Sequence, residues 1–223
     1  MFKKIKAKLA QLAVKPEPID VSEFGDSLAE SVSWSPAKGG GTNIKTHSLA
    51  KEDYNRYSFK ATYSAVLFFG VFVLFGAIFP IVFITSNSEG VGLVSWESLG
   101  VIGFGLIFMG AGLFMGYRFM RPIVFDKSVG FFWKGWKQPE MYGSDNPKGA
   151  IRLSDIHAFQ ILSEYIKSDN SSYHSYELNL ILKDGNRHNV IDHGKLSALR
   201  EDAKELSKFL GKPVWDITER SRR

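Results

Sequence analysis

The fold of this chain is decided by two apolar stretches in its middle, TYSAVLFFGVFVLFGAIFPIVFIT (residues 62–85) and VSWESLGVIGFGLIFMGAGLFMGY (residues 94–117). The only charged side chain in either stretch is Glu97, near the start of the second. A bilayer core about 30 Å thick requires roughly 20 apolar residues in a helix, and a helix satisfies its own backbone hydrogen bonds in lipid. The sequence therefore predicts a two-helix transmembrane hairpin over residues 61–117, embedded in a lipid bilayer.

Basic residues flank this hairpin at one end only. The connection between residues 86 and 95 contains no lysine or arginine, whereas several lie shortly before the first stretch or shortly after the second: Lys45, Lys51, Arg56, Lys60, Arg118, Arg121, Lys127, Lys134 and Lys137. Because cytoplasmic segments carry the excess of positive charge, we expect both termini in the cytoplasm. The net charge of +5 then suits an anionic leaflet. The basic residues are scattered rather than gathered on one periodic face, so nucleic acid is not an expected partner.

The second apolar stretch is rich in glycine. Gly112 and Gly116 form a GxxxG pair, and Gly105 lies one heptad before Gly112. Small residues let two helices approach closely in lipid, so these three glycines are predicted to mediate helix packing. Their partner is either the first helix of the same hairpin or the same helix of a second chain, which would give a homo-oligomer. Neither stretch carries an ionisable residue in its interior, which favours an anchor over an ion or proton path.

The segments before the hairpin differ in character. Residues 1–15 combine lysines with apolar residues at three- and four-residue spacing, which predicts a basic amphipathic helix, lying on the membrane surface or packed against protein. Residues 16–60 have a loop-like composition and form a predicted cytoplasmic linker. Two features of this linker indicate contact with another part of the chain. Trp34 is a large apolar residue that requires a pocket, and the loose alternation over residues 42–49 predicts a strand.

Residues 118–217 are predicted to form one cytoplasmic domain, followed by a basic tail at residues 218–223. Alternation and turn signals predict strands and one final helix. The expected elements are two strands within 123–133 around a turn at 126–130, strands at 151–165, 176–183 and 186–191, and a helix over 196–210 that ends at Gly211. If residues 42–49 pair with this sheet, the hairpin interrupts a single domain and Trp34 is buried against the same sheet.

A run of antiparallel strands closed by one amphipathic C-terminal helix resembles a pleckstrin-homology-like domain. The resemblance covers residues 120–217 and concerns the order of elements, with fewer strands than that family has. More loosely, the chain resembles uncharacterised bacterial inner-membrane proteins in which a two-helix hairpin carries such a domain. The resemblance implies a bacterial inner membrane. The expected fold class is a membrane α-helical hairpin plus an α+β, antiparallel β-rich pleckstrin-homology-like domain closed by a C-terminal helix.

No catalytic, cofactor-binding or metal site is expected. Cysteine is absent, which excludes disulfides, thiolate zinc sites and iron–sulfur clusters. No two histidines have metal-ligand spacing, and Asp192 or His193 is expected to cap the C-terminal helix. Asp155 and Glu164 lie on one predicted strand and point to opposite faces. The chain is therefore predicted not to be an enzyme, although a membrane-bound enzyme remains a third alternative.

The expected contacts with the membrane interface or a partner are Trp34, Lys134, Trp136 and Lys137. The last three belong to an aromatic and basic cluster shortly after the second apolar stretch, a mixture that suits the headgroup region. Most other aromatic residues of this cluster are expected in the core. The predicted function is a non-enzymatic membrane scaffold or adaptor, which assembles or regulates a complex with an unidentified membrane protein partner. The main alternative is a module that senses anionic lipid or another ligand.

Overall fold

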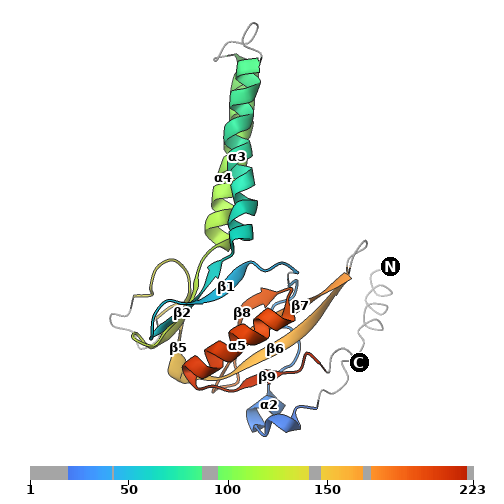
Figure 1. Ribbon diagram of the computed structural model, residues 1–223, viewed down its shortest axis with the longest axis vertical. Helices are drawn as coiled ribbons and strands as arrows, with labels where there is room; N and C mark the ends of the chain where they lie inside the picture. The colour runs from blue at the N-terminus through green and yellow to red at the C-terminus, as the bar shows by residue number, and fades with distance from the viewer. Residues whose placement is uncertain (1–19, 42, 87–94, 141–146, 168–171, 220–223) are drawn as a thin grey trace, which may run out of the picture.

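Two long helices project from a domain built of two β-sheets (Figure 1). The computed structural model describes residues 20–41, 43–86, 95–140, 147–167 and 172–219. The helices are α3 (Tyr63–Ser86) and α4 (Trp96–Phe119), and they lie side by side along their whole length. The amphipathic helix predicted at residues 1–15 and most of the basic tail lie outside the described residues.

The hairpin has the length and surface of a membrane-spanning unit. Both helices are 24 residues long and apolar enough to cross a membrane. Large apolar side chains point outward from both, among them Phe68, Leu74, Ile107 and Phe114. An exposed apolar surface of this extent suits lipid rather than water. The observed helices are displaced from the predicted stretches by one residue in α3 and two in α4.

Glycines hold the two helices together. Gly105, Gly112 and Gly116 are buried in α4. A Cβ atom on Gly105 would overlap Pro80, and one on Gly112 would lie 2.9 Å from the Cβ of Phe72. This close approach is what small residues permit in lipid. The predicted packing within the hairpin is therefore confirmed, and these three glycines already have a partner in their own chain.

The first sheet is antiparallel and contains the point where the hairpin is attached. Its strands follow chain order: β1 (His47–Lys51), β2 (Arg56–Ala61), β3 (Ile123–Asp126), β4 (Phe131–Lys134) and β5 (Ala150–Arg152). β2 pairs directly with β3, with Tyr57 opposite Phe125 and Phe59 opposite Ile123. The hairpin is therefore an insertion between two neighbouring strands of one domain.

This arrangement corrects one predicted strand boundary and adds one strand that the sequence does not predict. The N-terminal strand that joins the sheet spans residues 47–51, not 42–49. The strand β2 is not predicted from the sequence, because its polar residues resemble the flank of the first helix. The predicted turn at 126–130 is confirmed, since β3 and β4 form a hairpin around it.

The second sheet has four strands in the order β8-β7-β6-β9. They are β6 (Ile156–Lys167), β7 (Ser172–Leu182), β8 (Arg187–His193) and β9 (Val214–Asp216), and β9 runs parallel to β6. The strand predicted at 151–165 is in fact broken. The 3-10 helix η2 (Leu153–Asp155) lies between β5 and β6 and carries the chain from the first sheet to the second. The sequence does not predict β9, because three residues after Pro213 give no periodic signal.

The main core lies between the two sheets and the last helix, α5 (Leu196–Leu210). Its predicted boundaries are confirmed. Leu199, Ala203 and Leu206 form the buried stripe of α5 and pack with core residues that include Phe125 and Phe159. α5 covers one face of the second sheet (Figure 1), so that face is built from alternate apolar residues of β6 and β7.

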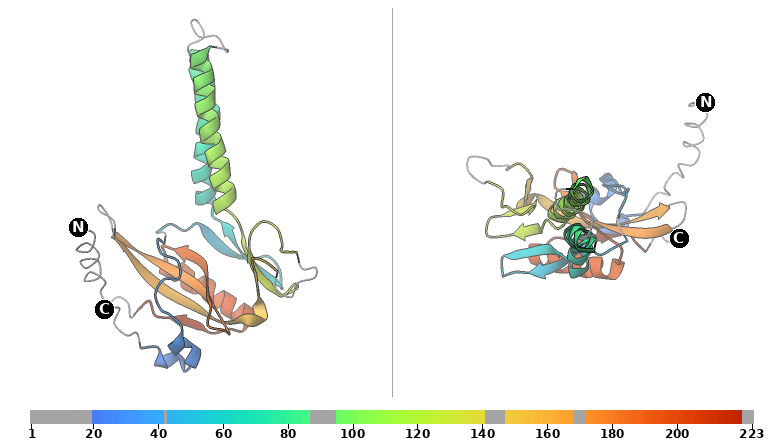
Figure 2. Two further views of the ribbon diagram at one scale, coloured as in Figure 1. Left: turned by 180° about the vertical axis from the view of Figure 1, so that it is seen from behind. Right: turned by 90° about the horizontal axis from the view of Figure 1, so that it is seen from above.

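Residues 20–41 cover the opposite face of the second sheet, as the view from behind shows (Figure 2). We call this segment the strap; it contains η1 (Ser22–Phe24) and α2 (Ser27–Ser31). Trp34 is half-buried in it, stacks on Phe24 at 5.6 Å between ring centroids, and lies 6.2 Å from Trp215. Its indole nitrogen donates a hydrogen bond to the Ala29 carbonyl at 2.8 Å. The predicted docking of Trp34 is therefore confirmed, although its pocket includes other strap residues.

Candidate functional site at the base of the hairpin

A hollow of about 600 Å³ lies where α4 meets the domain. Four cationic side chains line it from three parts of the chain: Lys38 from the strap, Arg118 and Arg121 from the end of α4 and the residues after it, and Lys134 from the end of β4. The sequence places these residues in three separate segments. Only the pairing of β2 with β3, and the path of the strap over the second sheet, bring them to one place.

These four cations have no carboxylate partner among the described residues. Within those residues, no ion pair involves Lys38, Arg118, Arg121 or Lys134. Arg121 donates from Nε to the Arg118 carbonyl at 3.1 Å, and Lys134 donates from Nζ to Oδ1 of Asn189 at 3.4 Å. These two acceptors are neutral, and four cations against the single lining carboxylate of Asp192 make the hollow electropositive.

Burial first, and then the positive charge of Lys38, affect the ammonium group of Lys134. Although Lys134 is exposed at the end of β4, burial lowers the pKa of its ammonium group to about 8, and the nearby charge of Lys38 acts in the same direction. Asp192 and Glu177 raise the pKa in part but do not restore its ordinary value. An ammonium group in this state is stabilised by any anion that enters the hollow.

Asp192 is the acidic residue that lines the hollow. Its carboxylate accepts a hydrogen bond from Nδ2 of Asn189 at 2.8 Å. Burial raises its pKa, while Lys38 and Lys134 act to lower it. Of the two residues predicted to cap α5, His193 and not Asp192 has this role, because the amide of the N-cap residue, Lys195, donates to Nδ1 of His193 at 2.9 Å. One acid against four cations leaves the hollow positive.

His193 has the structural role that the sequence predicts for one of these two residues. The side chain is fully buried, and burial lowers its pKa to about 4, with the charge of Lys45 contributing. The imidazole is therefore neutral at physiological pH, so its Nδ1 accepts the amide hydrogen at the start of α5.

His47 fastens one wall of the hollow. It is buried at the start of β1, and its Nε2 lies 3.2 Å from the Arg121 carbonyl. Burial lowers the pKa of His47, and the charge of Lys134 adds to this effect. Because a carbonyl only accepts, Nε2 carries the hydrogen, and the neutral ring ties β1 to the segment that follows α4.

Carboxylates of the second sheet hold the strap, and with it Lys38, in place. Glu177 is buried, and its side chain accepts hydrogen bonds from the amides of Ala37 and Lys38 at 3.0 to 3.2 Å. Glu164 accepts from the amides of Gly40 and Gly41 at 3.2 and 3.1 Å. These bonds replace the pairing that the strap, which is not a strand, cannot make with the sheet.

Gly41 shows why this part of the strap is glycine-rich. A Cβ atom there would overlap the Ser175 side chain, and its carbonyl accepts a hydrogen bond from the Tyr173 hydroxyl at 3.0 Å. Glycine permits this close approach of the strap backbone to the sheet. The sequence does not reveal Glu177, because a single acid between apolar residues of a strand suggests a solvent-facing position.

The remaining predicted contacts are divided between two places. Trp136 is 52% exposed, stacks on Tyr117 at 6.1 Å, and donates from Nε1 to the Tyr117 carbonyl at 3.2 Å. It therefore lies beside the end of α4, and Lys137 next to it is exposed. Trp133 is buried, as predicted for most of the cluster. Trp34 belongs to the packing beneath the strap and not to this surface.

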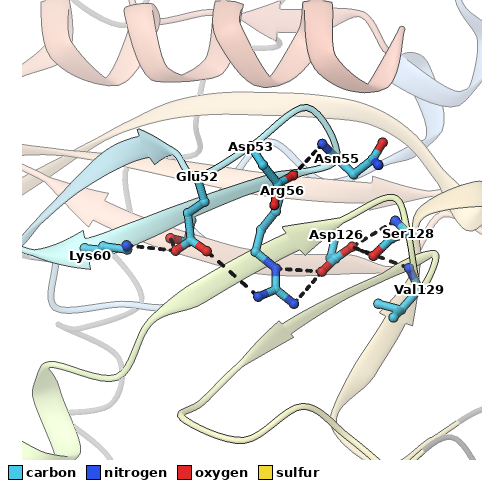
Figure 3. A network of polar contacts seen from close by, with 9 residues as sticks. Glu52, Asp53, Asn55, Arg56, Lys60, Asp126, Ser128 and Val129 are labelled. Carbon is cyan, nitrogen blue, oxygen red and sulfur yellow. Dashed lines mark hydrogen bonds and ion pairs between the residues drawn. The ribbon is translucent and has the colours of Figure 1, made fainter.

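A second hollow, of about 560 Å³, lies beside the first sheet and differs in charge. Its polar groups neutralise one another (Figure 3). Arg56 donates to Asp126, with Nε to Oδ2 at 2.6 Å, and Lys60 pairs with Glu52 at 2.9 Å. Burial alone would raise the pKa of Asp126, but hydrogen bonds from Ser128 and Arg56 outweigh it and the pKa is lowered. This network ties β2 to β3 and leaves no excess charge for a ligand.

Neither the chemistry of the described residues nor comparison with other proteins identifies an activity. Within the described ranges, no group of three or more histidine, aspartate or glutamate side chains is placed to hold a metal ion. The chain matches no family model, no curated protein and no solved structure.

Proposed function

We propose that this chain is an integral membrane adaptor of the bacterial inner membrane. In this proposal α3 and α4 span the bilayer, both termini are cytoplasmic, and the two-sheet domain assembles or regulates a complex with a membrane protein partner. The basic residues Arg118 and Arg121 at the domain end of α4 support this orientation, and so does the Trp136–Tyr117 pair beside them.

The observation that carries the proposal is the tight connection between hairpin and sheet. Only Thr62 separates β2 from α3, and three residues separate α4 from β3. The Thr62 amide donates to the Thr46 carbonyl at 2.9 Å, and its hydroxyl donates to the Lys45 carbonyl at 2.9 Å. A domain fixed in this way keeps one orientation to the bilayer, which is what a scaffold for other membrane proteins requires.

The architecture also supports the pleckstrin-homology-like assignment as a proposal. Two packed sheets followed by a C-terminal helix give the expected order of elements. Two features depart from it: the parallel strand β9 and the strap over the outer face of the second sheet.

The test is site-specific photo-crosslinking in native membranes. A photoreactive residue is placed at Trp136, beside the end of α4, or at Lys204, on the exposed side of α5. The adaptor proposal predicts one discrete protein adduct from one of these faces. It also predicts loss of that adduct when Gly-Ser-Gly-Ser is inserted both between Thr62 and Tyr63 and between Met120 and Arg121, because only the two insertions together free the domain from the hairpin. Adducts to lipid alone, or an adduct that survives the insertion, would contradict it.

Orientation is checked separately with a reporter that is active only in the cytoplasm. We expect activity from fusions at both ends of the chain. An inactive fusion at either end would show that the termini do not share the cytoplasmic side.

The electropositive hollow favours a second function, the sensing of an anionic ligand at the membrane surface. The two functions are compatible, since binding of a lipid beside the domain is one way to control an adaptor. The observation that favours it is a set of four cations at the domain end of α4 that form no ion pair with any carboxylate of the described residues.

A further inference from the structure

Three properties of the hollow indicate which class of ligand fits it. It contains four cations that form no ion pair within the part of the chain that the structure describes, it adjoins the end of a helix that has the length and composition of a membrane span, and it has an apolar wall. Phe119 provides that wall; it is 62% exposed and stacks on Phe69 of α3 at 5.8 Å. A ligand that fits is an anion with an apolar portion beside it.

We propose that this hollow binds the phosphate group of an anionic phospholipid in the leaflet next to the domain. Lys38, Arg118, Arg121 and Lys134 supply the cationic groups, and Phe119 faces the apolar part of the lipid. The proposal rests on the membrane orientation proposed above and names the ligand class of the second function.

Phosphate suits this set of donors for a chemical reason. A guanidinium group presents several N–H donors in a planar fork that matches phosphate oxygens, while lysine ammonium groups act as point charges. Arg118 lies in the last turn of α4 and Arg121 follows three residues later, so two forks and two ammonium groups border one space. A volume of about 600 Å³ is in the range of small-ligand sites.

The acids near the hollow do not cancel this attraction. Asp192 is held by Asn189, and Glu177 is directed to the strap amides and to Asn189. Both carboxylates lie near Lys134, but among the described residues neither forms an ion pair with it. The hollow thus retains room for further negative charge, unlike the neighbouring hollow, where Arg56 and Lys60 already have acidic partners.

The experiment measures lipid binding to the full chain in detergent by native mass spectrometry. Phosphatidylglycerol is the anionic lipid and phosphatidylcholine the neutral one. The main variant is K38Q/K134Q, which leaves the helix ends unchanged, and its matched control is K183Q/K204Q, which removes two lysines elsewhere on the domain. We expect phosphatidylglycerol to bind about tenfold more weakly to K38Q/K134Q and unchanged to the control. Thermal unfolding without added lipid verifies that both variants fold.

A second variant tests the arginine forks. R118K/R121K keeps the charge and the positive flank of α4 but removes the bidentate geometry. We expect binding between that of the original chain and that of K38Q/K134Q. If both double variants bind phosphatidylglycerol like the original chain, or if phosphatidylcholine binds equally well, the proposal is overturned.

Competition separates the two sources of phosphate. Inorganic phosphate and glycerol phosphate at millimolar concentration should displace little phosphatidylglycerol, because they lack the portion that contacts Phe119. Displacement by either at the same concentration as the lipid would show that the ligand is a soluble phosphate and would overturn the lipid assignment. Failure of the adaptor proposal is distinguishable, since it appears in the crosslinking and reporter assays while lipid binding in detergent persists.

Discussion

At the scale of single residues, Lys134 makes the proposed lipid binding depend on pH. Burial lowers the pKa of its ammonium group to about 8, from an ordinary value of 10.5. Below pH 8 the ammonium group is already charged in the free protein, so a phosphate binds without uptake of a proton. Above pH 8 binding must first take up a proton, so we expect the affinity for phosphatidylglycerol to fall by up to about tenfold per pH unit.

The control for this dependence is K134R, which stays charged throughout and should bind with little change between pH 7 and 10. The lowered pKa of Lys134 has the opposite effect on the stability of the protein without ligand. Because folding lowers this pKa, the contribution of Lys134 to stability should rise as pH increases from about 8 towards 10.5. Equal pH profiles for the original chain and K134R would show that Lys134 does not meet the ligand.

Glu177 supports a second residue-scale prediction. Its buried carboxylate accepts from two strap amides and from Nδ2 of Asn189. In E177Q one oxygen is replaced by an NH₂ group, which then faces donors. We expect a loss of stability of about 1–3 kcal/mol and faster proteolysis within the strap, measured by thermal unfolding and limited trypsin digestion. E201Q, at an exposed position of α5, should change neither. Unchanged digestion of E177Q would mean that the apolar contacts of the strap suffice.

The sequence predicts some of these residues and not others, for a physical reason. Lys134 and Trp136 are predicted because basic and aromatic residues follow an apolar stretch directly. Arg118 and Arg121 indicate orientation by the same pattern, but their convergence with Lys38 depends on a strap whose path is set by tertiary contacts. Glu177 is missed because both faces of its sheet are covered, which local alternation cannot reveal.

At the scale of elements, the glycines of α4 support a prediction about the hairpin. A Cβ atom on Gly112 would lie against Phe72 and Val73 of α3, whereas one on Gly103 would have open space within 4 Å. We expect G112I to separate the helices and lower stability by about 1–3 kcal/mol, while G103I changes little. Thermal unfolding in detergent measures both. A stable G112I with a smaller oligomer would instead indicate that Gly112 packs against a second chain.

The predictability of each element follows from its length and its surroundings. α5 is predicted to the residue because fifteen residues repeat one apolar stripe and end at Gly211, whose φ of 66° suits glycine. The break between β5 and β6 is missed because Ile151 and Leu153 alternate with Arg152 as in a strand, and apolar residues resume at Ile156. The short strand β9 depends on a neighbour, β6, that is distant in sequence.

At the scale of the whole molecule, the hairpin is an insertion between two paired strands of one sheet. The sequence suggests this, because the C-terminal segment has few predicted strands and the linker contains an unexplained tryptophan. The structure shows two N-terminal strands, β1 and β2, in the first sheet, and the strap beneath the second. The domain is therefore complete only when segments from both sides of the hairpin are present.

This topology predicts that the hairpin can be removed without loss of the domain. The register places Phe59 opposite Ile123, and its continuation places Ala61 opposite Arg121. Replacing residues 62–120 by Asn-Gly would then join β2 to β3 through a two-residue turn, the loop that antiparallel strands favour. We expect a soluble, monomeric protein that unfolds cooperatively, as measured by gel filtration and circular dichroism. Because Arg118 and Phe119 are deleted, its binding to phosphatidylglycerol should be weaker than that of the full chain.

The matched control is the same deletion carrying F59D. Phe59 is fully buried in the main core, so an aspartate there places a charge among apolar side chains and should abolish cooperative unfolding. If the shortened chain without F59D aggregates or unfolds like the F59D form, then the pairing of β2 with β3 during folding requires the hairpin. The hairpin would in that case contribute to the folding of the domain.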